Sequence, residues 1–194
     1  MERLICVLVG YVFGLIQTGY IYGKKNGVDL RKKGSGNAGT TNALRTMGWK
    51  AGAVTLLGDC FKCVVAVVVV HLIYGKTHTD MMPLLSMYAG MGAVLGHNYP
   101  FYLKFKGGKG IAATAGLIIS TTNIWIVLIC LAAFIAIFAA TRYVSLGSMT
   151  VVTIYLISVI VYGQHGGFGV ENVSYLHEMY GVAAFLMILA FWRH

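Results

Sequence analysis

The sequence predicts an all-α polytopic membrane protein with about seven transmembrane helices in one domain, residues 1–194. Hydrophobic residues make up 58% of the chain and charged residues only 11%, whereas soluble domains contain roughly 45–50% and about 25%. Apolar runs of helix length recur along the whole chain, and a spanning helix needs about 20 such residues. This composition excludes a disordered chain, a disulfide scaffold and a soluble nucleic-acid-binding protein, so no nucleic-acid partner is expected.

Seven apolar segments are expected to cross the membrane. They cover residues 4–22, 51–74, 82–96, 109–122, 123–140, 146–162 and 179–192. Segments 82–96 and 109–122 are short, as in helices that begin or end inside the protein. Because segments 109–122 and 123–140 are nearly continuous, six spans plus a re-entrant segment is an alternative.

The charges of the loops orient the chain. With seven spans, loops 23–50 and 97–110 fall on one side together with Arg142 and Arg193, and this side carries twelve cations against one acid, Asp29. The other side holds most of the acidic residues. Basic loops face the cytoplasm, so the N-terminus is expected outside and the C-terminus inside. For Lys24, Lys25 and the cluster Arg31–Lys33, the favoured interpretation is a topology signal and attraction to anionic lipid headgroups.

The first basic loop contains a glycine-rich run from Gly34 to Arg45. Glycines let backbone N–H groups turn toward a ligand, hydroxyl and amide side chains add donors, and an arginine suits phosphate. The predicted phosphate-binding residues of this run are Ser35, Gly36, Asn37, Gly39, Thr41, Asn42 and Arg45.

The second basic loop runs from Gly96 to Gly110 and ends where a helical pattern begins. A helix N-terminus offers free N–H groups and the positive end of the helix dipole to an anion. The predicted site residues here are Lys104, Gly107, Gly108, Lys109 and Gly110. His97 is the best candidate for a protein base, and its alternative role is that of a hydrogen-bonding histidine at the interface.

A third element, Arg142–Ser148, again carries a cation and small residues at the end of a span. We expect Arg142 and Ser145 to join the other two loops in one pocket on the cytoplasmic face. The alternative is that each element is only a helix cap or an interfacial anchor.

These three elements resemble the motifs of the bacterial acyl-phosphate–glycerol-3-phosphate acyltransferases, the PlsY family. The similarity is dense over residues 34–50 and 96–114. It implies a seven-helix enzyme of the bacterial inner membrane with its site on the cytoplasmic face. The enzyme would transfer a long-chain acyl group from acyl phosphate to the 1-position of glycerol 3-phosphate, giving lysophosphatidic acid and phosphate.

The resemblance also implies roles for individual residues. Ser35, Arg45 and Lys104 would hold glycerol 3-phosphate or the donor phosphate, the Gly107–Gly110 turn would supply backbone donors, and Ser145 would line the same pocket. A phosphate oxygen of the substrate would serve as the base. Family members continue from an Arg-His pair into a basic tail with an asparagine. Here His194 matches the histidine as a substrate-binding residue, and no residue of this sequence takes the asparagine's role.

Other polar groups in the spans have structural interpretations. Asp59 and Lys62 stand three residues apart and are expected to form a packed pair, and Cys60 and Cys63 are expected to pack as small apolar side chains. We expect no metal and no cofactor, because the motif loops carry no acidic residue to hold magnesium. The alternative function is a transporter or channel for phosphate or phosphorylated solutes. The sequence leaves the oligomeric state open.

Overall fold

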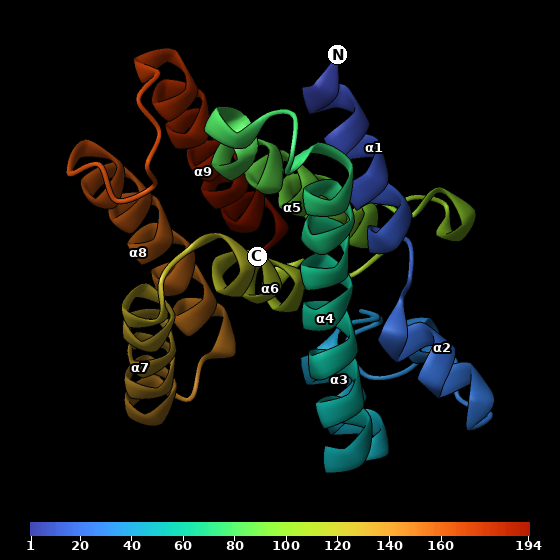
Figure 1. The fold of residues 1–194 in the computed structure, drawn as a ribbon. Helices are drawn as coiled ribbons and strands as arrows, with labels where there is room; N and C mark the ends of the chain where they lie inside the picture. Colours follow the sequence, from blue (N-terminus) through green and yellow to red (C-terminus); the bar gives the residue numbers. More distant parts are fainter.

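The computed structural model describes all 194 residues, and their secondary structure is entirely helical. The α-helices are α1 Glu2–Gly14, α2 Thr18–Lys25, α3 Thr40–Met47, α4 Trp49–Tyr74, α5 Met82–Asn98, α6 Ile111–Thr121, α7 Ile124–Thr141, α8 Val144–Gln164 and α9 Val173–Arg193. Short 3-10 turns lie at Leu30–Lys32, Thr79–Met81 and Phe101–Leu103. The predicted all-helical class is confirmed, and every predicted apolar segment falls on helical residues (Figure 1).

Five helical stretches are long and apolar enough to cross a membrane: Glu2–Lys25, α4, α7, α8 and α9. The first of these, predicted as one continuous helix, is in fact broken at Leu15–Gln17 into α1 and α2. Helix α6 has only 11 residues, which is about 16 Å of helix against a hydrocarbon core of about 30 Å. Its helical residues alone cover about half of that thickness, so α6 is not among the five long stretches. Helix α3 is an addition, since it lies within the predicted loop 23–50.

Helix α5 is the central element, with 13 of its 17 residues buried. Its closest partner is α1, and the contact depends on glycine in both helices. A Cβ on Gly10 would overlap the carbonyl oxygen of Ala89, and one on Gly92 would overlap that of Val7. Small residues allow such close backbone approach between membrane helices. The break that follows α1 therefore lies against the end of α5, where Gln17 Nε2 donates to the His97 carbonyl at 3.0 Å.

We predict that Gly10→Ala lowers the stability of the protein by about 1–3 kcal/mol, because the added methyl group must push α1 away from α5. The measurement is the thermal unfolding midpoint of the detergent-solubilised protein. Gly181→Ala in α9 is the matched control, since nothing lies within 4 Å of a Cβ built there. An unchanged midpoint for Gly10→Ala would show that the helices are not packed this closely.

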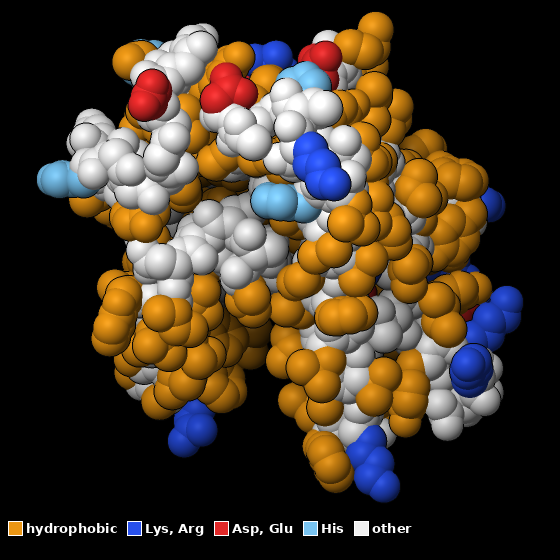
Figure 2. Space-filling model, viewed as in Figure 1, with side chains coloured by type: hydrophobic (Ala, Val, Ile, Leu, Met, Phe, Trp, Pro, Cys, Tyr) orange, Lys and Arg blue, Asp and Glu red, His pale blue; other side chains and the backbone are white.

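The surface shows two features of a membrane protein. Large apolar side chains are exposed around the helices, among them Leu72 and Trp125, which are 81% and 71% exposed. Figure 2 shows the Asp and Glu side chains that are clearly visible at the upper end of the molecule, where some Lys and Arg also lie, and further Lys and Arg at the lower end and lower right. In the same view an open hollow, flanked largely by apolar atoms, divides the lower half between α7 on one side and α4 on the other.

Candidate functional site

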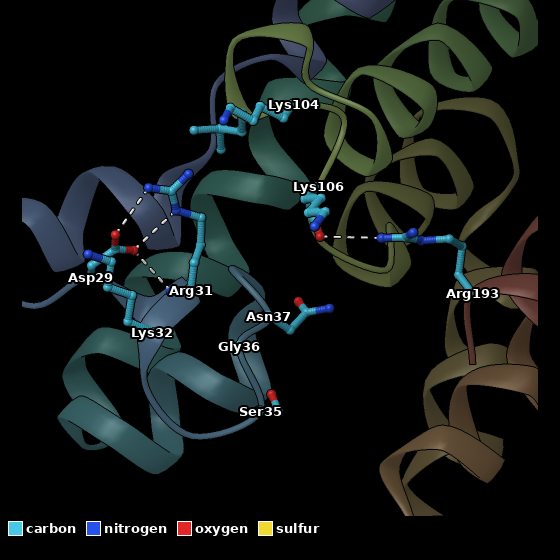
Figure 3. A pocket seen from close by; sticks show the side chains of 11 residues that line it. Asp29, Arg31, Lys32, Ser35, Gly36, Asn37, Lys104, Lys106 and Arg193 are labelled. Atoms are coloured by element: carbon cyan, nitrogen blue, oxygen red, sulfur yellow. Dashed lines mark hydrogen bonds and ion pairs between the residues drawn. The ribbon is translucent and has the colours of Figure 1, made fainter.

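The two basic loops, far apart in sequence, meet in one cavity of about 560 Å³ (Figure 3). The first loop contributes the 3-10 turn at Leu30–Lys32 and the bend that follows it. The second loop contributes residues 103–107, and the end of α9 contributes Arg193. The full lining is Asp29, Arg31, Lys32, Ser35, Gly36, Asn37, Leu103, Lys104, Lys106, Gly107 and Arg193. In Figure 3 the Asn37 side chain extends across the open space toward the side that carries Arg193, whereas Arg31 turns toward Asp29.

The cavity carries an excess of positive charge. Five cations and a single carboxylate line it. The carboxylate, Asp29, already pairs with Arg31 through an Nη2–Oδ2 contact of 3.0 Å and a second bond from Nε. The guanidinium holds the pKa of Asp29 below its usual range, so this carboxylate stays ionised and paired with Arg31. The other four cations have no acidic partner, which makes the cavity suited to an anion carrying more than one negative charge.

Asn42 organises the first loop. Its side chain is 2% exposed, and its Nδ2 donates to the carbonyls of Leu30, Lys33 and Asn37 at 2.8–3.0 Å. Its Oδ1 accepts from the backbone N–H of Ser35. Asn42 was predicted to bind phosphate, but its amide is fully used inside the protein. Gly34 must be glycine here, because it has φ +60 and a Cβ would overlap Oδ1 of Asn42.

The second loop is fixed to the end of α5. The N–H groups of Gly107 and Gly108 donate to the carbonyls of Asn98 and His97, both at 3.1 Å. From the other side, the Arg193 guanidinium donates to the carbonyls of Gly107 and Gly108 at 3.3 and 2.9 Å. It also lies 5.2 Å from the centre of the Tyr99 ring, at cation–π distance. The N–H groups and the carbonyl groups of Gly107 and Gly108 are therefore all hydrogen-bonded within the protein.

The predicted set of backbone donors in this turn needs correction. The N–H groups of Gly107 and Gly108 bond to α5 and are not free. Those of Lys109 and Gly110 have no hydrogen-bond partner, and they directly precede α6, whose first N–H groups are also without helical partners. Only this second half of the turn offers donors to an anion.

Five of the predicted site residues line the cavity: Ser35, Gly36, Asn37, Lys104 and Gly107. The Oδ1 of Asn37 accepts from Gly39 N–H at 2.8 Å, which leaves its Nδ2 donor at the cavity. Lys104 and the following Phe105 both adopt left-handed backbone, with φ 56 and 59. Such strain in two adjacent non-glycine residues is typical of functional loops.

The other predicted residues lie outside the lining. They are Gly39, Thr41, Asn42, Arg45, His97, Gly108, Lys109, Gly110, Arg142, Ser145 and His194. Arg45 is exposed in the last turn of α3 with no side-chain partner, and His97 is only 2% exposed. Lys109 is half-buried, and this burial lowers the pKa of its ammonium. His194 bonds to the Ala190 carbonyl at 2.8 Å and therefore stays with its own helix.

The expected convergence of three elements holds for two of them only. Arg142 ends α7 and Ser145 begins α8, and both are exposed. In Figure 1 this connection lies at the lower end of α7 and α8, apart from the first loop around α2 and α3. The two helices pack against each other, and this turn is a helix cap in the structure.

Six cavity residues were not predicted as site residues: Asp29, Leu103 and the four cations Arg31, Lys32, Lys106 and Arg193. Arg31 and Lys32 were interpreted as lipid-facing charges, and Arg193 as the end of a span. Their proximity to the glycine runs is a signal for Arg31, Lys32 and Lys106. The local signal for Arg193 is the Arg-His pair of the resemblance, and the packing of α9 brings this side chain to the cavity.

The chain contains no group of three or more His, Cys, Asp or Glu residues that could hold a metal ion. All four cysteines are free, and none lines the cavity. The polar groups that line the cavity are cations, one carboxylate, a hydroxyl group, an amide and backbone groups.

Comparisons with known proteins agree on one family. The family model described as glycerol-3-phosphate acyltransferase matches residues 4–194. A protein of that name from Clostridioides difficile (strain 630) is 46% identical over 147 residues, 75% of this chain and 71% of the relative. Another, from Halalkalibacterium halodurans, is 40% identical over 191 residues, 97% of this chain and 86% of the relative.

Solved structures give the same result. The crystal structure of PlsY, an integral membrane glycerol 3-phosphate acyltransferase, in its glycerol 3-phosphate form matches all of this chain and 88% of that chain. The TM-score is 0.83 at 30% sequence identity. The lysophosphatidic acid form of the same protein matches with a TM-score of 0.82 at 29% identity.

Proposed function

This chain belongs to the glycerol-3-phosphate acyltransferase family, and on that premise we propose that its acyl donor is a long-chain acyl phosphate. The acceptor is glycerol 3-phosphate, acylated at its 1-position, and the products are lysophosphatidic acid and inorganic phosphate. The observation that carries the proposal is the cavity where the two basic loops meet, with four cations unpaired by any acid. Such a cavity suits a reaction in which both reactants carry phosphate.

The cations address the main obstacle to this reaction. Two phosphate-bearing molecules repel each other at the few ångströms that transfer requires. Lys32, Lys104 and Lys106 line the cavity where such charges would gather. Preorganised positive groups offset the repulsion and stabilise charge that develops in the transition state. Positioning supplies the remaining acceleration.

The chemical step needs no strong protein base in this proposal. The 1-hydroxyl attacks the acyl carbonyl carbon, the bond from that carbon to the bridging phosphate oxygen breaks, and phosphate leaves. The hydroxyl proton passes to a phosphate oxygen. Ser35, the Asn37 amide and the free N–H groups of Lys109 and Gly110 would orient the phosphates. Arg45, exposed on α3 without a partner, would contribute charge from the same face.

The acyl chain would lie in the apolar hollow between α7 and α4 (Figure 2). This arrangement keeps the hydrocarbon among helices and lipid while the phosphate reaches the basic loops. A transporter was the alternative, but the charged side chains buried in the helix bundle, Asp59 and Lys62, pair with each other. The family comparisons also favour transfer over transport.

The donor is tested with the purified protein and labelled glycerol 3-phosphate. We predict that palmitoyl phosphate supports formation of lysophosphatidic acid and that palmitoyl-CoA does not, because CoA cannot leave as the inorganic phosphate that this mechanism needs. Product is separated by thin-layer chromatography. Equal rates with both donors would contradict the proposed donor while leaving the family's acyl transfer intact.

For the topology we propose seven spans in the bacterial inner membrane, with the N-terminus outside and the cavity on the cytoplasmic side. Support comes from the two basic loops, which meet at one cavity, and from the Lys and Arg side chains at the lower end of the molecule, where no Asp or Glu is clearly visible (Figure 2), because basic loops stay in the cytoplasm. The shorter helices α5 and α6 would complete the seven with the five long stretches.

Labelling of single cysteines tests this topology. In a variant lacking the four native cysteines, we predict that Thr41→Cys is protected from an impermeant reagent in sealed right-side-out vesicles. Glu171→Cys, exposed in the loop between α8 and α9, is the matched control and should react. Labelling of Thr41→Cys from outside would contradict the proposed orientation and indicate the opposite one.

A further inference from the structure

We propose that Lys62 is a positioning residue of the acyl-transfer site, which it supports through His97 without contacting substrate. The inference rests on the proposed function and deepens it. Lys62 is 4% exposed on α4, and its ammonium lies between the break of the first helix and the end of α5. These are the two elements from which the second basic loop is held.

The ammonium uses all three of its protons. It donates to the carbonyl of Gly14 at 3.2 Å, to that of Ile16 at 2.6 Å and to Nδ1 of His97 at 2.8 Å. An ammonium has three donors and no acceptor, so this set is complete. Asp59 Oδ1 lies 3.0 Å from the same nitrogen and balances its charge. Together these groups replace water around a charge that would otherwise be very costly to bury.

The carbonyls of Gly14 and Ile16 explain why a buried ammonium is needed beside the break between α1 and α2. The break between α1 and α2 leaves carbonyls without helical partners, and inside a membrane protein they must be satisfied internally. Lys62 satisfies those of Gly14 and Ile16, and the Tyr102 hydroxyl donates to that of Leu15 at 2.7 Å. Tyr102 belongs to the second basic loop. The break and the loop are thus joined directly.

His97 contacts both Lys62 and the glycine turn, so the position of Lys62 affects that of the turn. Because Nδ1 accepts from the ammonium, the ring proton is on Nε2, and this edge of the ring packs on Gly108. A Cβ at Gly108 would overlap Nε2, so no space separates them. The His97 carbonyl also accepts from Gly108 N–H at 3.1 Å and from Gln17 Nε2 at 3.0 Å. Gly107, which directly precedes Gly108 in the chain, lines the cavity.

This geometry assigns His97 a role other than that of a base. Its Nδ1 lone pair accepts from Lys62, its Nε2 packs on Gly108, and the residue is 2% exposed and does not line the cavity. A group that supports the turn affects how well the pocket fits its phosphate ligand, and a misplacement of about 1 Å can cost about 100-fold in rate.

The first test uses Asp59→Asn/Lys62→Met. Removing both charges avoids the stranded carboxylate that Lys62→Met alone would leave. We expect this variant to fold and to lose about 100-fold in kcat/KM, mostly through a higher KM for glycerol 3-phosphate. Arg3→Met/Glu178→Gln is the matched control, since it neutralises a 2.6 Å ion pair at the other end of the molecule. The control should keep the wild-type KM.

The second test compares two replacements of His97. In His97→Asn the amide oxygen can accept from Lys62 in place of Nδ1, whereas His97→Leu has no acceptor. We expect Asn to stay within about tenfold of the wild type and Leu to lose about 100-fold in kcat/KM. If His97 were the base, both would lose kcat equally and the acidic limb of the pH–rate profile would disappear.

The outcomes separate this inference from the proposed function. A wild-type protein without acyl transfer would contradict the function itself. An active wild type, with a folded Asp59→Asn/Lys62→Met variant of unchanged KM, would overturn only the role of Lys62. If that double variant does not fold, the comparison of His97→Asn with His97→Leu decides, and equal activities there would overturn the proposal.

Discussion

Replacing Lys104 by alanine is expected to lower the rate of acyl transfer by about 100-fold or more, the usual cost of removing one preorganised group that stabilises transition-state charge. Lys104 lines the cavity and has no acidic partner. Its left-handed backbone, φ 56, belongs to the turn that places the loop over the first basic loop. The measurement is kcat/KM for glycerol 3-phosphate with a saturating acyl donor.

Lys33→Ala is the matched control for this experiment. It removes the same charge from the first basic loop, but Lys33 does not line the cavity. We expect its rate to stay close to that of the wild type, because exposed charges outside the site are largely screened by salt. Similar losses in both variants would mean that the rate depends on the overall positive charge of this surface and not on the cavity.

Gly108→Ala is expected to reduce acyl transfer by about 100-fold, for a different reason. The added methyl group would overlap the His97 ring, so either the ring or the glycine turn must move. Movement of the turn displaces Gly107 and the carbonyls that Arg193 holds at 2.9 and 3.3 Å. Displacements of about 1 Å are sufficient for a loss of this size. The readouts are kcat/KM and the thermal unfolding midpoint.

Gly181→Ala is again the control, because its new methyl group meets no atom within 4 Å. It should be active and equally stable. Near-normal transfer by Gly108→Ala would show that the turn tolerates displacement, and it would count against both the cavity and the role given to His97. The prediction differs from a simple reading of the glycine-rich motif, in which glycine would be required for close approach of the substrate.

Much of the fold was predictable because its signals are local. Apolar runs of helix length identify the helices, and the glycine–cation runs at Gly34–Arg45 and Gly96–Gly110 identify the two loops that form the cavity. Small residues such as Gly92 and Gly96 also indicate close helix packing. Each of these features depends on residue type and spacing within one segment, so no knowledge of distant contacts is needed.

The sequence alone determined that this is a helical membrane protein with phosphate-suited loops, and the tertiary structure decided which residues of those loops face the cavity. Asn42 turned inward because three carbonyls of its own loop needed donors. Arg193 joined the site because α9 packs beside the glycine turn, and Arg142 did not because its helices pack elsewhere. Such outcomes depend on contacts between residues distant in the chain, which no local pattern records.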